Sequence, residues 1–200
     1  MDDIFSKAYV DMISPARGGV DEFIKKYDAK EQITRADIVD LLAVAAIDEW
    51  LAVFNYYASE AHTKTNGKQD FDPEFIAHAK EELEHFEKIN NRIRELSQVP
   101  LQIPMQSYFS ANSSGLEWKQ ELNSSDSVEI LRRRLEEERG AIKFYAMLIR
   151  ALKKLEEETG EYDSTTETLV KNIKADEEEH EKDLRELLAQ YDEEHTEVIA

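Results

Sequence analysis

The chain has 200 residues, 41% of them hydrophobic, and a formal net charge of −19 from 44 acidic and 25 basic side chains. That length suits one domain with a sizeable core, while the negative charge opposes binding to the phosphate backbone of a nucleic acid. Because the chain has no cysteine, disulfides, iron–sulfur clusters and thiolate metal sites are excluded, and any metal must be held by Asp, Glu or His.

The N-terminal region is predicted to form an extension over residues 1–33. Pro15 and the pair Gly18-Gly19 divide it into short helical pieces that lead into the first long helix. The opening residues Met1 to Phe5 lack the basic-then-apolar order of a secretory signal, and no run approaches the ~20 apolar residues of a membrane span. We therefore expect a cytoplasmic protein that makes no contact with a membrane.

The first half of the chain predicts a helical hairpin. From about Thr34 to His62 there is no Gly or Pro, and apolar residues recur at three- and four-residue spacing. A polar turn that contains Gly67 follows. Asp72-Pro73-Glu74 then supplies a capping residue, a proline at the first helical position and an acid, so a second helix is predicted from Asp72 to about Ser97.

The segment from about Gln98 to Asp126 predicts a long crossover. It contains prolines and clustered Ser and Asn, yet it also carries Leu101, Ile103 and Trp118. Long structureless loops are rare inside compact domains unless they have a specific role, so we expect this segment to pack along the bundle.

The second half predicts another helical hairpin. One helix should run from an acid-then-Glu box at Asp126 to about Glu158, with Gly160 as its stop, and the next from a Ser164–Glu167 capping box to about Tyr191. The expected fold is an all-α four-helix bundle over residues 34–192 with a polar tail over 193–200. Because the crossover can return the chain to its starting end, the second and third helices should be parallel.

The tetrapeptide Glu-x-x-His occurs twice, as Glu82 to His85 and as Glu177 to His180. Residues three apart are neighbours on a helix surface, so the carboxylate and the imidazole of one tetrapeptide can bind the same metal ion. Bundles that bind two irons or manganeses take a Glu-x-x-His from each of two helices and a single Glu from each of the other two.

A single glutamate precedes each tetrapeptide at a matching place in its half of the chain. Glu49 lies seven residues before Tyr56, and Glu138 lies seven residues before Tyr145. Seven residues is close to two helical turns, so each tyrosine should lie on the same face as its glutamate.

The helical period assigns these glutamates to the inward face, among residues such as Ala45, Val53, Ala141 and Phe144. Isolated buried carboxylates are costly unless they are paired or bound to metal, and four carboxylates with two imidazoles around two divalent cations would be neutral. The sequence therefore predicts six metal ligands: Glu49, Glu82, His85, Glu138, Glu177 and His180.

These residues resemble the ferritin-like superfamily, and most of all its Dps-like members that carry a bacterioferritin-type di-iron site inside each subunit. The resemblance covers roughly Ile38 to Leu188. It rests on four segments: Asp48-Glu49-Trp50-Leu51-Ala52, His78-Ala79-Lys80-Glu81-Glu82 running into His85, Glu137-Glu138-Arg139-Gly140-Ala141-Ile142, and Asp176-Glu177-Glu178-Glu179-His180-Glu181.

The resemblance implies a ferroxidase that oxidises Fe(II) with hydrogen peroxide or oxygen and protects against oxidative stress. It also implies a homo-oligomeric hollow cage, commonly of twelve subunits, that stores the ferric mineral. Each subunit would bind two iron ions, with manganese or zinc as possible substitutes. One ion would be held by Glu49, Glu82 and His85 and the other by Glu138, Glu177 and His180, with Glu82 and Glu177 bridging.

The same resemblance implies a set of residues just outside the ligands. Tyr56 and Tyr145 would support them, and Glu81 and Asp176 would accept hydrogen bonds from the histidine nitrogens that do not bind metal, as is usual around metal sites. Independently of the resemblance, the position of His78 one turn before Glu82 allows two interpretations. It is either an outer ligand or an entry-site residue, or it is a helix-surface or hydrogen-bonded histidine, and the second interpretation is favoured.

Three departures from the family limit what carries over. Leu83 replaces the methionine that would ligate a bacterioferritin haem, so no haem is expected. Gly140 stands where one cysteine of a Dps-like pair near the site would fall, and the chain has no other cysteine, so a thiol-based redox step is ruled out. The acidic N-terminus, with Asp2, Asp3 and Asp11, is unlike the basic tails with which some Dps proteins coat DNA, so no nucleic acid partner is expected.

Two other functions remain open from the sequence. A di-metal peroxidase or manganese catalase on the same bundle would turn over without retaining iron, as a dimer or hexamer. A helical interaction protein without enzymatic activity would use the acids only as surface charge.

Overall fold

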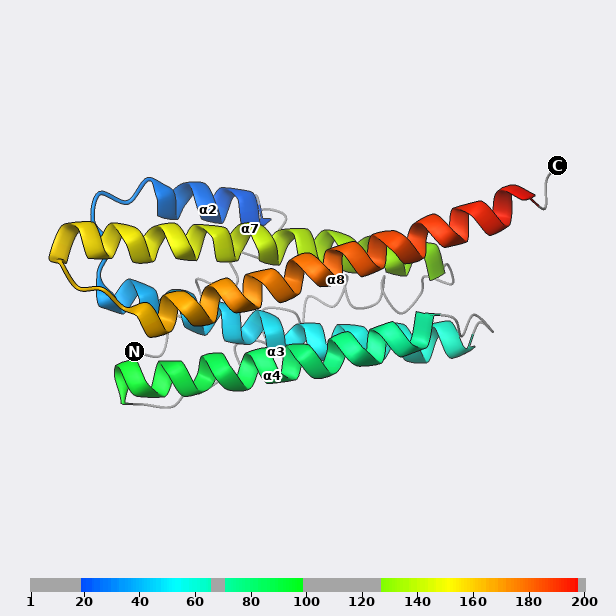
Figure 1. The fold of residues 1–200 in the computed structure, drawn as a ribbon, viewed down its shortest axis with the longest axis horizontal. Helices are drawn as coiled ribbons and strands as arrows, with labels where there is room; N and C mark the ends of the chain where they lie inside the picture. Colours follow the sequence, from blue (N-terminus) through cyan, green and yellow to red (C-terminus); the bar gives the residue numbers. More distant parts are fainter. Residues whose placement is uncertain (1–18, 66–70, 99–126, 198–200) are drawn as a thin grey trace, which may run out of the picture.

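The computed structural model describes residues 19–65, 71–98 and 127–197, which form helices and the turns beside them (Figure 1). The helices are α2 (Gly19–Asp28), α3 (Arg35–Thr65), α4 (Asp72–Ser97), α7 (Ser127–Thr159) and α8 (Ser164–Glu197). This part of the chain contains no strand, and the four long helices form a bundle. The predicted all-α four-helix bundle is confirmed.

The bundle consists of two antiparallel hairpins, one formed by α3 and α4 and the other by α7 and α8. Figure 1 shows that α4 and α7 run in the same direction, as expected for a chain with one long connection between its hairpins. The predicted crossover between them, residues 99–126, lies outside the described residues. The expectation that it packs along the bundle stays a prediction.

Helix α2 belongs to the N-terminal extension and lies along α7. Its one fully buried side chain, Phe23, stacks on Phe144 with 6.0 Å between ring centroids. Asp28 forms an ion pair with Arg150 at 2.7 Å near the other end of α2. An apolar anchor and an exposed ion pair thus hold this short helix against the bundle.

Three helix starts show which residues serve as caps. Thr34 and Asp37 cap α3 reciprocally, because the backbone N–H of each donates to the side chain of the other, at 2.9 and 3.2 Å. The predicted Ser164 cap of α8 is wrong by one residue: Asp163 accepts the N–H of Thr166 at 3.0 Å. The predicted Asp72 cap is also wrong by one residue, since Phe71 takes the N-cap position of α4 without a side-chain hydrogen bond.

The helix ends follow the backbone signals. Gly160 ends α7 with φ of +74°, and its N–H donates to the carbonyl of Glu156 at 2.7 Å, which confirms the predicted stop. Gln98 ends α4 in the left-handed region, with φ of 58°. Helix α8 continues to Glu197, beyond the expected end at Tyr191, because no Gly or Pro interrupts this run. None of the described helices is long and apolar enough to span a membrane.

Two apolar clusters fill the bundle on either side of a polar middle layer. The larger contains Leu41, Ile89, Leu148 and Ile173, and the smaller contains Phe75 and Leu131 among others. Along each long helix, the predicted metal ligands lie between the residues of one cluster and those of the other. Closely packed side chains above and below therefore fix the position of the polar layer.

Candidate metal centre

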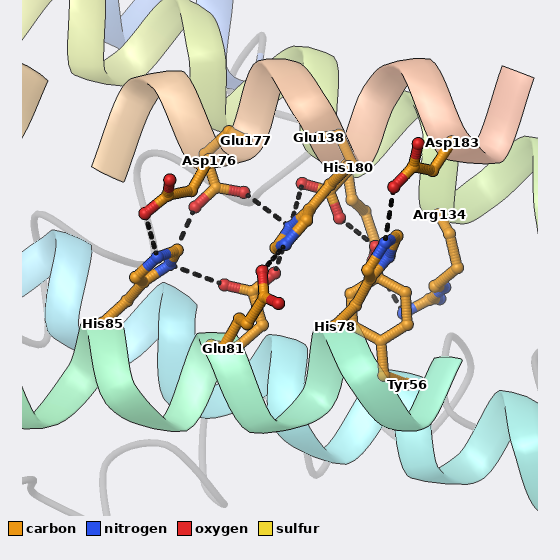
Figure 2. A network of polar contacts seen from close by, with 12 residues as sticks. Tyr56, His78, Glu81, His85, Arg134, Glu138, Asp176, Glu177, His180 and Asp183 are labelled. Carbon is orange, nitrogen blue, oxygen red and sulfur yellow. Dashed lines mark hydrogen bonds and ion pairs between the residues drawn. The ribbon is translucent and has the colours of Figure 1, made fainter. Parts of the chain in front are cut away.

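The structure brings all six predicted ligands together in the polar layer. Each of the four long helices contributes to it, and no ligand residue is more than 4% exposed. Figure 2 shows the histidines and carboxylates of α4 and α8 pointing toward one another across the bundle. In helical order the six are Glu49 on α3, Glu82 and His85 on α4, Glu138 on α7, and Glu177 and His180 on α8.

These residues form two overlapping groups that could each hold a metal ion. One consists of Glu49, Glu82, His85 and Glu177, and the other of Glu82, Glu138, Glu177 and His180. Within each group, one ligand atom from every residue lies within 4.8 Å of the others. Glu82 and Glu177 belong to both groups, so their two carboxylates are placed to bridge a pair of ions.

The Nδ1 atom of each imidazole faces the carboxylates. His85 Nδ1 lies 3.3 Å from Glu49, 3.2 Å from Glu82 and 3.2 Å from Glu177. His180 Nδ1 lies 3.2 Å from Glu82, 3.5 Å from Glu177 and 3.9 Å from Glu138. Each histidine thus presents one nitrogen to a group of three carboxylates.

The other nitrogen of each imidazole contacts a carboxylate on the opposite hairpin. His85 Nε2 lies 3.1 Å from Asp176, and His180 Nε2 lies 2.9 Å from Glu81 (Figure 2). Such a contact fixes the ring orientation and directs the lone pair of Nδ1 to the metal side. Asp176 and Glu81 stand where the sequence predicted them, and both are about half exposed, at 45% and 53%.

The two predicted tyrosines cross between the hairpins. The hydroxyl of Tyr56 on α3 donates to Glu138 on α7, and the hydroxyl of Tyr145 on α7 donates to Glu49 on α3. Both rings are 1% exposed. Each tyrosine therefore contacts the glutamate of the other half rather than the glutamate seven residues before it.

The four carboxylates divide into two electrostatic classes. Burial and the nearby charges of Glu177 and Glu82 raise the pKa of Glu49 and of Glu138 well above the ordinary value. Burial acts in the same direction on Glu82 and Glu177, but their contacts with His180 and His85 hold the pKa of each below the ordinary value. Although burial alone would lower it, contacts with Glu177 and Glu82 raise the pKa of His180 to about 12. Without metal, these residues would form protonated acids and ion pairs.

The family model of the ferritin-like domain matches residues 39–193, which include all six of these residues. The chain belongs to the ferritin-like family. Among solved structures it is similar to the bacterioferritin-related protein of Bacteroides fragilis, described as a dodecameric thioferritin. The two chains share 28% sequence identity, and the match covers 90% of this chain and 99% of that one with a TM-score of 0.67. A comparison with curated proteins found no match.

The ligand set of this ferritin-like chain fits a pair of divalent cations. Carboxylate and imidazole donors suit iron, manganese and zinc. Two buried ligand atoms, Glu177 Oε1 and His180 Nδ1, lack a hydrogen bond even though carboxylate and imidazole atoms lie nearby. Buried polar atoms that lie close together without hydrogen bonds are costly unless they bind an ion between them.

Two polar residues around the ferritin-like centre were given no role from the sequence. Arg134, one turn before Glu138 on α7, is 3% exposed and forms an ion pair with Glu137 at 2.7 Å. Burial raises the pKa of Asp48, next to Glu49, to about 7. Both residues could have been found from their places on or beside the inward face. In that segment only Glu49 was predicted as a ligand, because its aliphatic and alanine-rich neighbours mark the inward face of the helix.

The favoured interpretation of His78 was wrong. This histidine is 3% exposed and stacks on His180 with 4.0 Å between ring centroids, while the Tyr56 ring packs against it edge-on at 5.1 Å. Burial and the neighbouring His180 lower the pKa of His78 to about 3. It is a buried residue of the polar layer, and its four-residue spacing from Glu82 was the signal for that position.

Proposed function

We propose that the protein is a Dps-like di-iron ferroxidase, which oxidises Fe(II) with hydrogen peroxide or oxygen and stores ferric iron in a self-assembled cage. The observation that carries the proposal is the pair of overlapping four-residue groups that share Glu82 and Glu177. Membership of the ferritin-like family gives this arrangement its chemical context. A cytoplasmic location and a role in oxidative-stress protection are part of the proposal.

In this proposal the two groups take up the substrate iron. Glu49 and His85 bind one ion, Glu138 and His180 the other, and Glu82 and Glu177 bridge them. Two iron ions held about 3.5–4 Å apart can supply two electrons to one oxidant molecule together. Manganese or zinc would be bound as substitutes, because the same donors suit them.

The remaining residues orient the ligands and handle protons. Tyr56 and Tyr145 donate hydrogen bonds to the terminal glutamates and restrict their rotation. Asp176 and Glu81 keep the outer histidine nitrogens protonated, so that Nδ1 is free for the ion. Glu49 and Glu138 must release their protons when the ions bind, since burial favours the protonated form of both.

Assembly into a twelve-subunit cage is supported by one comparison. The similar protein from Bacteroides fragilis is described as dodecameric, and the match covers 99% of that chain. A cage gives the oxidised iron a closed space, whereas a small oligomer would release it. Storage and assembly are therefore tested together.

The deciding experiment measures mass and iron on the same sample. Protein loaded with Fe(II) and hydrogen peroxide is passed through size exclusion with light scattering, and iron per chain is determined on the eluted peak. The proposal expects an assembly of hundreds of kilodaltons with far more than two irons per chain. A small oligomer with about two metals per chain would favour the non-storing peroxidase or manganese catalase. Absence of bound metal would overturn the di-metal centre.

A further inference from the structure

The internal repeat allows each residue of the centre to be compared with its counterpart in the other half. Glu49 corresponds to Glu138, and Glu82-x-x-His85 corresponds to Glu177-x-x-His180. The contacts repeat as well: each outer histidine nitrogen reaches an acid of the opposite hairpin, and each tyrosine reaches the opposite glutamate. The polar layer is nearly symmetric. A residue whose counterpart in the other half is of a different chemical type therefore has a role that the repeat does not account for.

The departure lies at one end of the centre. His78, four residues before Glu82, corresponds to Ile173, four residues before Glu177, which is 1% exposed in the larger apolar cluster. Asp183, three residues after His180, corresponds to Lys88, which is half exposed and pairs with Glu84 at 3.6 Å. One end of the centre therefore carries an imidazole and a carboxylate, where the other end carries an aliphatic side chain and a cation. The His78 end also carries the buried Arg134, which corresponds to Ala45 and whose charge is paired with Glu137 at 2.7 Å (Figure 2).

His78 and Asp183 face each other at this end (Figure 2). His78 Nε2 lies 3.8 Å from an Asp183 oxygen, which is too long for a hydrogen bond. Two ligand atoms that bind one ion at about 2.1 Å each can lie up to about 4.2 Å apart. The observed separation is therefore compatible with two ligands of a single cation.

The surroundings of the pair agree with a cation site. The side chain of His78 is 3% exposed, and its Nδ1, on the side of the ring away from Asp183, has no hydrogen bond partner, so no hydrogen bond at Nδ1 fixes the ring. Asp183 is 27% exposed, so it connects the buried imidazole to solvent. The His78 ring stacks on His180 at 4.0 Å, which puts the pair beside the half of the centre that contains Glu138.

We propose that His78 and Asp183 form a third divalent-cation site, through which ions pass from solvent to the half of the centre that contains Glu138 and His180. With two protein ligands it would bind ions weakly and release them to the four-residue group that contains Glu138 and His180. This inference rests on the proposed function, because it supplies ions to the di-metal centre. It also makes the two halves unequal, with the Glu138 half filled first.

The test uses Co(II) as the probe and crystals of the full-length protein soaked in it. Anomalous difference maps should show an ion in each four-residue group and a third ion between His78 Nε2 and Asp183. Asp183→Asn should lose the third ion alone. Glu186→Gln is the matched control, because Glu186 lies one turn along the same helix, is 59% exposed and makes the same change of charge. The control should keep all three ions.

A solution measurement gives a second readout. Co(II) titration carried to saturation should show two tightly bound ions and one weaker ion per chain for the wild type. The weaker ion should be lost in Asp183→Asn and in His78→Phe, which keeps a ring against His180. Rapid mixing with Co(II) should show slower filling of the centre in both variants, by about tenfold, because the site concentrates cations at its mouth. Glu186→Gln should match the wild type.

The outcomes separate the two proposals. If both four-residue groups fill and no third ion appears in the wild type, or if the third ion persists in Asp183→Asn, the inference is wrong and the proposed function stands. If no ion binds in either four-residue group, the di-metal centre is wrong and the third site fails with it.

Discussion

The hydroxyl of Tyr56 on α3 donates a hydrogen bond to Glu138 on α7, which joins the two hairpins directly at the candidate metal centre. The same relationship, with the hairpins exchanged, links Tyr145 to Glu49. Each terminal glutamate is thus held by a side chain of the other hairpin. The ligand geometry therefore depends on how the two hairpins pack together. Removing a single hydroxyl group tests this dependence.

Tyr56→Phe is expected to weaken metal binding without unfolding the bundle. The change removes one hydroxyl from a fully buried ring and leaves Glu138 free to rotate. Loss of such an outer contact typically lowers metal affinity by about 10- to 100-fold. Isothermal titration with Co(II) measures the effect. Tyr57→Phe, at a neighbouring ring that is 45% exposed, is the control, and an equal loss in both variants would contradict the proposed contact.

Divalent metal is expected to raise the thermal stability of the wild type and not that of Glu177→Gln. An ion that binds only the folded state stabilises it by about 2.7 kcal/mol at 100 times its dissociation constant. Glu177 belongs to both four-residue groups, so its loss should weaken both ion sites. Melting curves with and without Mn(II) measure the shift. A metal-dependent shift of the same size in Glu177→Gln would argue against the bridging role.

Asp163→Asn is expected to destabilise the protein at neutral pH by about 1–2 kcal/mol. Asp163 caps α8 and binds Arg92 through both carboxylate oxygens, at 2.7 and 2.8 Å. Although burial opposes the shift, its hydrogen bonds with Thr166 and Arg92 lower its pKa in the folded state. Its contribution is therefore present above the unfolded pKa of about 3.9 and is lost as pH falls through the lower folded pKa.

Denaturant unfolding at several pH values tests this sign. The difference between the wild type and Asp163→Asn should be full at pH 7 and should shrink as the pH falls below about 4. Asp28→Asn is the control, since Asp28 pairs with Arg150 where both side chains are about half exposed, at 43% and 52%. Such a surface pair should contribute less than about 1 kcal/mol. A difference for Asp163→Asn that grows toward acid pH would contradict the assignment.

Gly140→Ala is expected to stabilise the protein by up to about 1 kcal/mol, because glycine in a helix interior costs about that much relative to alanine. Among the described residues, the neighbour that a Cβ at this position would meet is Val20, at 3.9 Å, which is ordinary van der Waals contact. Gly160→Ala should have the opposite effect, since Gly160 has φ of +74°. Thermal melts of the two variants should move in opposite directions. A loss of stability in Gly140→Ala would show that α2 packs more tightly on α7.

The sequence predicted which residues face the bundle interior better than it predicted their partners. Spacings of three, four and seven residues on a helix determine a shared face, so Glu49, Glu138 and the two tetrapeptides could be placed from sequence alone. Nothing in that periodicity says which side chain lies opposite. The crossed contacts of Tyr56 and Tyr145 therefore needed the structure.

Helix ends show a different limit. Asp163 and Ser164 are adjacent residues of the same capping type, and only the position of the Thr166 amide decides between them. His78 shows a third limit. A histidine suits both surface and interior, and its burial depends on its contact with His180 on α8, which no local pattern records.

The crossed contacts have a consequence for how such a chain could arise. Each hairpin contributes the same set of residues to the centre, namely a glutamate, a tyrosine and an acid-Glu-x-x-His segment, and every contact described for the tyrosines and outer acids runs from one hairpin to the other. Two identical hairpins related by a two-fold axis could therefore build the whole layer. A protein of half this length, paired with itself, could therefore possess the centre. The two halves differ at the end with His78, Asp183 and Arg134, where the other half has Ile173, Lys88 and Ala45.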